Sequence, residues 1–397
     1  MSKSRHGDGR SELRPATHFV TGGRDPLAYH GFVNPPVVHA STVLYRSADD
    51  YLANRNRYSY GRRGTPTSEA LSEALIAIEG PQCAGVTLLP SGLAAASAAL
   101  LSVVRAGDHV LMTDNVYLPT RKFCDTILTR YGVTTGYFDP MIGADIATLF
   151  KRNTRAVLLE APGSLTFEVQ DVPAIADVAH RHSAVVLMDN TWASPLYFRA
   201  LDKGVDLSIQ SGSKYIGGHS DLMLGVVAAN KTAWDSLHET VFESGLCVGP
   251  DDMYLGLRGL RTMAVRLAHH YDAGLKVANW FAQRSEVSCV LHPALESCPG
   301  HAIWKRDFTG ACGLFSIVLR PVVTAKAHAF IDALTLFGIG ASWGGYESLV
   351  IPFDGAPLRT ATTWSPEGPT IRFHIGLEDV DDLIADLDQA FAAVAAS

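Results

Sequence analysis

A lysine that precedes a pair of glycines is the residue with the clearest chemical potential in this sequence. Residues 206–221 read DLSIQSGSKYIGGHSD, so Lys214 follows a short apolar pattern and lies among small residues. Small neighbours leave the amine sterically open, and burial would lower its pKa and free it as a nucleophile. Such an amine could form a Schiff base with a carbonyl compound, although a lysine taken alone is more often an ordinary loop residue.

An aspartate upstream has the properties of a partner for a positively charged ring. Asp189 ends the apolar run VVLM at 185–188. A carboxylate there is costly to bury without a cationic partner. A helix cap or an ordinary turn explains Asp189 about as well when it is considered alone. A protonated pyridine nitrogen is the partner that would give it a chemical role together with Lys214.

Two short stretches of small residues could hold a phosphate group, because a helix start offers backbone N–H groups and a favourable dipole. Tyr117 follows an apolar run, where its ring could lie over a flat ligand. Each feature is common by itself. A Schiff-base lysine, a ring-nitrogen partner, a phosphate site and a stacking ring are together what pyridoxal 5'-phosphate (PLP) requires, so we predict this cofactor. The residues expected at its phosphate are Gly92, Leu93, Ser211 and Ser213.

The apolar runs that precede these residues alternate with helical patterns. Runs at 86–89, 110–113, 156–160, 184–188, 207–210 and 224–228 are nearly continuous in apolar side chains, as in strands buried on both faces. The order of strands and helices predicts an α/β fold with a mostly parallel sheet. Ligands of such sheets bind beyond the carboxyl ends of the strands. The candidate residues follow strands at that edge, so they can converge.

Three parts of the chain differ in pattern. Residues 1–64 are interpreted as an extended N-terminal arm, because they lack periodicity and are rich in Pro, Tyr, Arg and Asn. Thr65 and Pro66 then predict a helix start, with a capping side chain before a proline in the first turn. We expect the large sheet domain over 65–258 and a smaller α+β domain over 259–397, in which 370–375 alternate like an edge strand.

The composition argues against several classes of partner and site. The 397 residues are 47% hydrophobic and 18% charged, with a formal net charge of −7 and no long basic run. We therefore expect no nucleic-acid partner, and no apolar stretch is long enough for a membrane span. The six cysteines are scattered without a Cys-x-x-Cys pair, which argues against a metal site and favours a cytoplasmic location.

Several motifs are similar to those of the cysteine/methionine-metabolism family of PLP-dependent enzymes of fold type I. These motifs are YGRRGTPT at 60–67, MDNTWA at 188–193 and SKYIGGHSD at 213–221. Within the family, FDPMIGADI at 138–146, SWGGYES at 342–348 and HIGLED at 374–379 resemble the bacterial cystathionine β-lyases. The resemblance covers nearly the whole chain after about residue 15. It implies an aspartate-aminotransferase-like sheet domain and a dimer-built site, typically in a tetramer.

The resemblance also implies cofactor roles for the matching residues. Lys214 would form the Schiff base, Asp189 would pair with the pyridine nitrogen, and Tyr117 would stack on the ring. Tyr60 and Arg62 would reach the phosphate of a neighbouring subunit, and Tyr60 would also contact the substrate there. The phosphate would also be held by Gly92, Leu93, Ser211 and Ser213.

The substrate and the reaction follow from the same resemblance. Arg372 and Ser342 would hold the α-carboxylate, since a planar guanidinium matches a carboxylate with two hydrogen bonds. Lys214 would remove the Cα proton, and Lys214 or Tyr117 would protonate the leaving thiolate. The products of this α,β-elimination of a cysteine thioether would be a thiol, pyruvate and ammonia. Trp343 favours this reaction over the γ-elimination or γ-replacement of other members, which remain alternatives beside a cysteine desulfhydrase.

Two departures from the family concern the distal end of the substrate. Lys122, preceded by Arg121, stands where bacterial β-lyases have an acidic residue suited to an ammonium group, and Ala341 stands where they tend to have a tyrosine. These changes suggest a thioether with an anionic distal arm, such as S-(2-sulfoethyl)cysteine, whose β-elimination would release coenzyme M. Alternatively, both cations are solvated on a helix and the substrate is cystathionine. A non-catalytic regulator of the same fold is a further alternative, against which the intact set Lys214, Asp189 and Arg372 argues.

Overall fold

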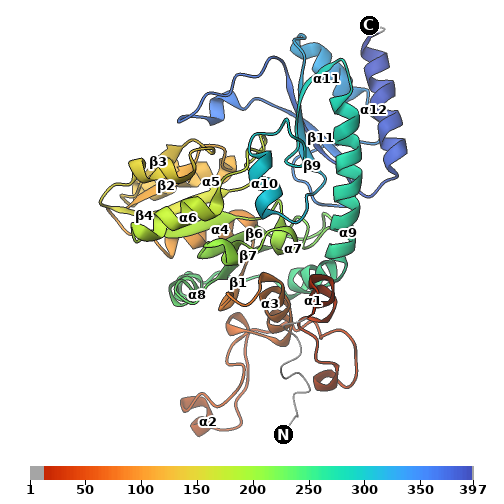
Figure 1. The fold of residues 1–397 in the computed structure, drawn as a ribbon. Helices are drawn as coiled ribbons and strands as arrows, with labels where there is room; N and C mark the ends of the chain where they lie inside the picture. Colours follow the sequence, from red (N-terminus) through yellow and green to blue (C-terminus); the bar gives the residue numbers. More distant parts are fainter. Residues whose placement is uncertain (1–12, 396–397) are drawn as a thin grey trace.

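A seven-stranded sheet forms the centre of the larger part of the computed structural model, which describes residues 13–395 (Figure 1). The strand order is β1-β7-β6-β5-β4-β2-β3. Strand β7 runs antiparallel to both of its neighbours, while the other pairs are parallel, so the predicted mostly parallel sheet is confirmed. The strands are β1 Gly85–Leu89, β2 His109–Thr113, β3 Thr134–Phe138, β4 Thr154–Glu160, β5 Val185–Asp189, β6 Leu207–Ser211 and β7 Gly225–Ala229.

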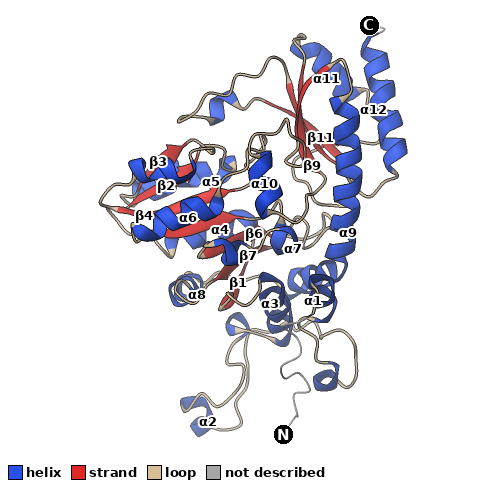
Figure 2. Cartoon of the chain, viewed as in Figure 1, coloured by secondary structure: helices blue, strands red, loops and turns tan. Residues whose placement is uncertain are grey.

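Helices cover both faces of this sheet (Figure 2), because alternate residues of a strand point to opposite sides. Along β4, Ala156 and Leu158 belong to one buried apolar cluster, with residues of α4 (Gly92–Leu101). Val157 and Leu159 belong to the other, with residues of α3 (Pro66–Glu79) and α6 (Val172–Arg181). Burial on both sides explains why the strands read as continuous apolar runs.

The smaller sheet has five strands in the order β10-β11-β12-β9-β8. Strand β12 pairs with β11 on one side and β9 on the other, so the predicted edge strand at 370–375 is wrong. All five residues of β12 are buried, because Arg372 and His374 alternate with apolar neighbours yet face the interior between the two sheets. The bounds are β8 Val287–Leu291, β9 Leu314–Leu319, β10 Gly338–Ile339, β11 Leu349–Phe353 and β12 Thr370–His374.

One long helix, α9 (Pro250–Ala282), runs from the larger sheet to the smaller one (Figure 1). The predicted boundary between residues 258 and 259 falls inside it. Among residues 13–395, no helix is both long and apolar enough to cross a lipid bilayer. The other helices are α5 Leu118–Lys122, which continues as a π-helical turn over Phe123–Leu128, α7 Ser194–Tyr197, α8 Trp234–Glu243, α10 His301–Asp307, α11 Thr324–Asp332 and α12 Val380–Ala395.

The N-terminal segment begins against the core and then leaves it. Helix α1 (Pro15–Thr21) packs on α3 and α9, and Phe19 is buried there. The following residues form an extended arm that carries α2 (Ala48–Leu52) away from both sheets (Figure 1). The arm returns to α3, where Thr65 caps the helix and Pro66 is its first residue, as predicted. Residues 1–12 of the predicted arm lie outside the described part of the chain. Short 3-10 turns lie at Pro26–Tyr29, Gly61–Arg63, Gly143–Leu149, Ala200–Lys203 and Ala356–Leu358.

Candidate active site

A cavity of about 640 Å³ lies beyond the carboxyl ends of the parallel strands, where the smaller sheet faces the larger one. Strand ends of both sheets supply its walls. This is the edge at which the sequence predicts a ligand site. The residues that line it include Gly92, Tyr117, Glu160, Asp189, Lys214 and Arg372.

Lys214 follows β6 in a tight turn and points its amine toward the smaller sheet. Its Nζ donates a hydrogen bond to Ser342 Oγ at 2.6 Å and lies 5.6 Å from the centre of the Trp343 ring. Burial and the positive charge of Arg372 lower the pKa of Lys214 to about 8, against an opposing effect of Asp189. An appreciable fraction of this amine is therefore unprotonated at physiological pH, as a nucleophile or general base requires.

Arg372 presents a buried guanidinium without a carboxylate. It extends from β12, and its Nη2 donates to the main-chain oxygen of Ser342 at 2.8 Å. Its Nε is buried and has no hydrogen-bond partner among the described residues 13–395. Burial lowers the pKa of Arg372 to about 10. Because a buried unpaired cation is costly, this group is suited to receive the carboxylate of an incoming ligand.

Ser342 connects these two cations, and its backbone is held in an uncommon conformation. Its φ is 79°, in the left-handed region that non-glycine residues rarely adopt. The hydroxyl accepts from Lys214, and the carbonyl accepts from Arg372. The neighbouring Trp343 and Ala341 also line the cavity. The Ser-Trp-Gly-Gly motif thus lies directly over the lysine.

Asp189 and Glu160 end neighbouring parallel strands and are paired in register. Asp189 Oδ1 accepts hydrogen bonds from the hydroxyl of Thr191 at 2.5 Å and from its main-chain N–H at 3.0 Å. Burial raises the pKa of Asp189, although Thr191 and Lys214 oppose this. Glu160 Oε2 accepts from the main-chain N–H of Tyr117 at 2.7 Å. Glu160 was not predicted as a site residue, although its place at the end of an apolar run is the same signal that identified Asp189.

The predicted phosphate residues meet at one end of the cavity. Gly92 is the first residue of α4, and Leu93, Ser211 and Ser213 line the same end. A Cβ on Gly92 would lie 2.6 Å from Cβ of Ser211, so the close approach of α4 to β6 requires glycine here. The Ser213 hydroxyl accepts from the N–H of Leu224 at 2.9 Å, which fixes its position.

Four predicted site residues do not line this cavity. Tyr60 and Arg62 line a second hollow of about 690 Å³ on the arm, and Arg62 lies 4.5 Å from the centre of the Phe242 ring. Lys122 is exposed at the end of α5. Arg121 is buried, with its Nη1 3.0 Å from Asp114 Oδ1. The structure therefore does not bring Arg121 or Lys122 to the cavity within one chain.

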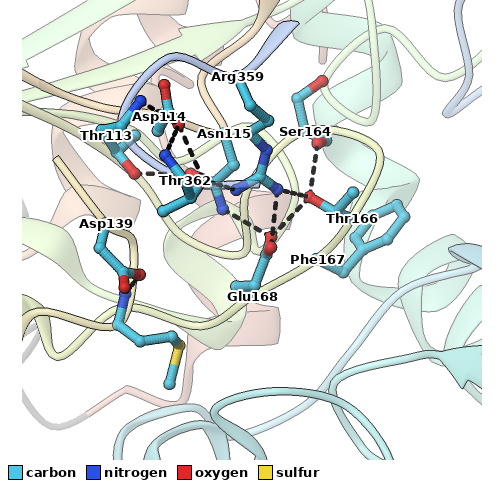
Figure 3. A network of polar contacts seen from close by, with 12 residues as sticks. Thr113, Asp114, Asn115, Asp139, Ser164, Thr166, Phe167, Glu168, Arg359 and Thr362 are labelled. Atoms are coloured by element: carbon cyan, nitrogen blue, oxygen red, sulfur yellow. Dashed lines mark hydrogen bonds and ion pairs between the residues drawn. The ribbon is translucent and has the colours of Figure 1, made fainter. Parts of the chain in front are cut away.

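Arg121 instead binds Asp114, which belongs to a polar network that joins the two sheets. Figure 3 shows the part of this network around Asp114, Glu168 and Arg359. Residues 354–369, which connect β11 to β12 and are called the strap below, cross to the larger sheet. Asp114, directly after β2, accepts main-chain N–H groups from residues 360, 361 and 362 of the strap at 2.8–3.1 Å. Arg359 of the strap binds Glu168 at 2.7 Å. The only sequence signal for this network is a run of polar residues after β2.

Known proteins match nearly the whole chain. The family described as Cys/Met metabolism PLP-dependent enzyme matches residues 16–392. A protein of Rhizobium johnstonii, provisionally named a cystathionine beta-lyase, is 56% identical over 94% of this chain and 95% of its own length. Cystathionine beta-lyase MetC of Escherichia coli is 45% identical over 95% of this chain and 98% of its own. The crystal structure of metB from Corynebacterium glutamicum is similar with a TM-score of 0.89 and 29% identity, over 98% of this chain and 100% of that one. The chain belongs to the family of Cys/Met metabolism PLP-dependent enzymes.

Proposed function

We propose that this PLP-dependent enzyme is a carbon–sulfur β-lyase that acts on cystathionine. The observation that carries the proposal is the arrangement of Lys214, Ser342 and Arg372, in which an amine with a lowered pKa lies near a buried guanidinium that has no carboxylate partner among residues 13–395. Relatives that are 45% and 42% identical are named cystathionine beta-lyases. The reaction is an α,β-elimination that releases a thiol, and hydrolysis of the remaining three-carbon product by water yields pyruvate and ammonia.

The residues of the cavity fit PLP. The glycine at the start of α4 leaves room that a Cβ would fill, and the buried carboxylate of Asp189 has no cationic hydrogen-bond partner of its own. Lys214 would hold the cofactor covalently, Asp189 would face its ring nitrogen, and Tyr117 would face its ring. Its phosphate would lie against Gly92, Leu93, Ser211 and Ser213.

Different side chains carry out different steps of the elimination. When bound, PLP supplies a sink for the negative charge that develops at Cα of the substrate. Arg372 and Ser342 orient the substrate by its α-carboxylate. Lys214 takes the proton from Cα, which its lowered pKa allows near neutral pH, and the thiolate leaves from Cβ. Lys214 or Tyr117 returns a proton to the departing sulfur.

A second subunit is part of this proposal. Exposed apolar side chains are concentrated on the arm, where Leu27, Phe32, Leu44 and Leu52 are 71–85% exposed in the single chain. Such side chains favour contact with another protein surface. We place Tyr60 and Arg62 at the phosphate and substrate end of the cavity of a neighbouring subunit, in a homotetramer built from dimers. A cytoplasmic location is proposed because the scattered cysteines suit a reducing compartment.

The alternative substrates have less support. The sulfonate-bearing thioether that releases coenzyme M was suggested by Arg121 and Lys122, but Arg121 is engaged with Asp114 and Lys122 is exposed outside the cavity. Trp343 lines the cavity beside Lys214, and this bulky ring favours β- over γ-chemistry. A non-catalytic regulator would not need a lysine with a pKa lowered to about 8.

The test is a product assay with purified, cofactor-loaded enzyme. Cystathionine should yield pyruvate and a new thiol, and Lys214→Ala should abolish both. Parallel reactions contain S-(2-sulfoethyl)cysteine and cysteine, and a 2-oxobutyrate assay detects γ-cleavage. Pyruvate from the sulfonate alone, or 2-oxobutyrate as the main product, would replace the proposed substrate or reaction. No product from any thioether would favour the regulator.

A further inference from the structure

Glu160 is a second carboxyl group in the cavity, and none of the roles described above uses it. It ends β4 opposite Asp189, the last residue of β5, and both side chains face the cavity. Parallel strands lie about 4.8 Å apart, so the two carboxyl groups are close neighbours in a largely buried space. Two carboxylates in such a place cannot both ionise readily.

The two carboxyl groups differ in their hydrogen-bond partners and in the charges near them. Asp189 accepts two hydrogen bonds from Thr191, and Lys214 attracts its negative charge. The Glu160 side chain accepts one bond, from the main chain of Tyr117. Burial raises the pKa of Glu160 well above its ordinary value, and the charge of Asp189 raises it further. The other charged groups that line this cavity are Lys214, Glu347 and Arg372, and none of them is among the causes of this shift.

The hydrogen bond that the Glu160 side chain accepts comes from Tyr117, a residue of the proposed reaction. Tyr117 immediately precedes α5, and its half-exposed ring projects into the cavity. The N–H of Tyr117 is 2.7 Å from Glu160 Oε2, so the carboxyl group fixes the main chain from which the ring extends. The main-chain oxygen of Glu160 is itself held by Gln170 Nε2 at 2.6 Å, which keeps the end of β4 in place.

We propose that Glu160 is a positioning residue of the elimination. Its carboxyl group is the neutral member of the pair, holds the main chain at Tyr117, and leaves the negative charge to Asp189. A neutral acid retains a carbonyl oxygen for the Tyr117 N–H and adds no anion beside Asp189. The inference rests on the proposed function, because Tyr117 and Asp189 act on the substrate and cofactor of that reaction.

The protonation state can be measured in cofactor-free protein, independently of activity. The infrared difference spectrum between wild type and Glu160→Gln at pH 7 should contain the carbonyl band of a protonated carboxylic acid. Glu79→Gln is the matched control. Glu79 is a buried carboxyl group beneath β6 whose pKa burial raises to about 8, so it contributes a second band that this variant removes. Carboxylate bands in place of the acid band in the Glu160 difference spectrum would overturn the proposal.

The positioning role predicts rescue by the conservative variant. Glu160→Ala removes the bond to Tyr117, and we expect kcat/KM to fall about 10- to 100-fold, mainly through kcat. Glu160→Gln keeps the size, neutrality and acceptor oxygen, and should recover most of that loss. If the glutamine variant is as impaired as the alanine variant, the neutral-acid role is wrong. If wild type shows no β-lyase activity while the infrared result holds, the proposed function fails but the neutral state of Glu160 stands.

Discussion

The amine of Lys214 lies between opposing charges, and this position sets the pH range in which it can act. Arg372 disfavours its protonated form and Asp189 favours it, while burial tips the balance toward the neutral amine. A lysine with its ordinary pKa near 10.5 would be almost entirely protonated at pH 7. The same residue is thus held ready to accept a proton from a substrate whose carboxylate Arg372 binds.

This balance predicts how Lys214 reacts in the cofactor-free protein. Its acylation rate should rise with pH around a midpoint of about 8. Arg372→Met removes the neighbouring positive charge and should move the midpoint to higher pH, whereas Asp189→Asn should move it lower. Mass spectrometry of a Lys214 peptide measures the rate, with exposed Lys231 in the same digest as reference. A midpoint that both variants leave unchanged would contradict this electrostatic account.

Residue types and their surroundings drew attention to Lys214 and Asp189, whereas Arg372 was assigned only through the family resemblance. Lysine and aspartate are uncommon where the surrounding pattern is apolar, so these two stood out. Glu160 ends a strand in the same way, yet its role depends on Asp189 being its neighbour in the sheet, and strand order is not readable from the pattern. Arg121 was assigned to the substrate because the sequence does not reveal that Asp114 lies under it.

At the scale of elements, β12 shows how polar alternation can mislead. Alternating Thr, Arg and His indicate a strand with one wet face, and this pattern predicted an edge. The polar face instead meets the cavity and the buried cluster around His270, whose ring lies 5.2 Å from that of His374. The polar residues of this pattern therefore marked a site inside the protein. Thr65, in contrast, was predicted correctly as a helix cap, because capping depends only on neighbouring residues.

Weakening the contacts between the strap and the larger sheet should lower the stability of the protein. Asp114→Asn removes the nearer and buried anion of Arg121, leaving only Asp125 at 3.9 Å, and weakens the bonds to residues 360–362. We expect a loss of about 3 kcal/mol in the free energy of unfolding, measured with urea. Asp332→Asn, an exposed position on α11, should change it by less than about 0.5 kcal/mol. Equal effects of the two variants would show that the strap contributes little.

The sign of the pH dependence follows from the same aspartate. Burial raises the pKa of Asp114, but hydrogen bonds from the strap and Arg121 outweigh it, and the net shift is downward. A carboxyl group with a lowered pKa in the folded state contributes stability above its unfolded pKa and loses it as the pH falls through the folded value. The difference between wild type and Asp114→Asn should therefore shrink below about pH 4.

For the whole molecule, the decisive feature is the arm and the subunit it serves. If Arg62 completes the active site of a neighbouring subunit, each site takes Lys214 from one chain and Arg62 from the other. When an Arg62→Ala chain pairs with a Lys214→Ala chain, both defects therefore fall in the same site and the other site is intact. Chains co-expressed with two different tags and purified through both should contain one intact site per pair. We expect each mixed pair to recover up to about half of the activity of a wild-type pair. An inactive mixed species would show that each arm serves its own chain.

The sequence was sufficient to predict the fold class. It was not sufficient to predict which strands are neighbours or how the strap contacts the larger sheet. Apolar runs and helix caps are local, so six of the seven strands of the larger sheet fall close to their predicted places. Strand β3 was not predicted, because it lies at the edge of the sheet and its residues are mostly not buried. The second sheet was read only in part, because β10 is two residues long and β11 contains Pro352, which weakens its strand pattern. The strap and the register of β4 with β5 depend on distant contacts, which no single stretch encodes.

Helix α9 has a consequence for how this chain could be cut or recombined. Its 33 residues would span about 50 Å. Leu260 and Met263 pack in the core of the larger sheet, whereas Val277 and Phe281 pack in that of the smaller one. A chimera joined to a relative at residue 258 would therefore build α9 from two parents, and the two parts would come from proteins with different cores. Crossover points before residue 250 or after 282 keep the helix from a single parent, and such chimeras should be the ones that fold.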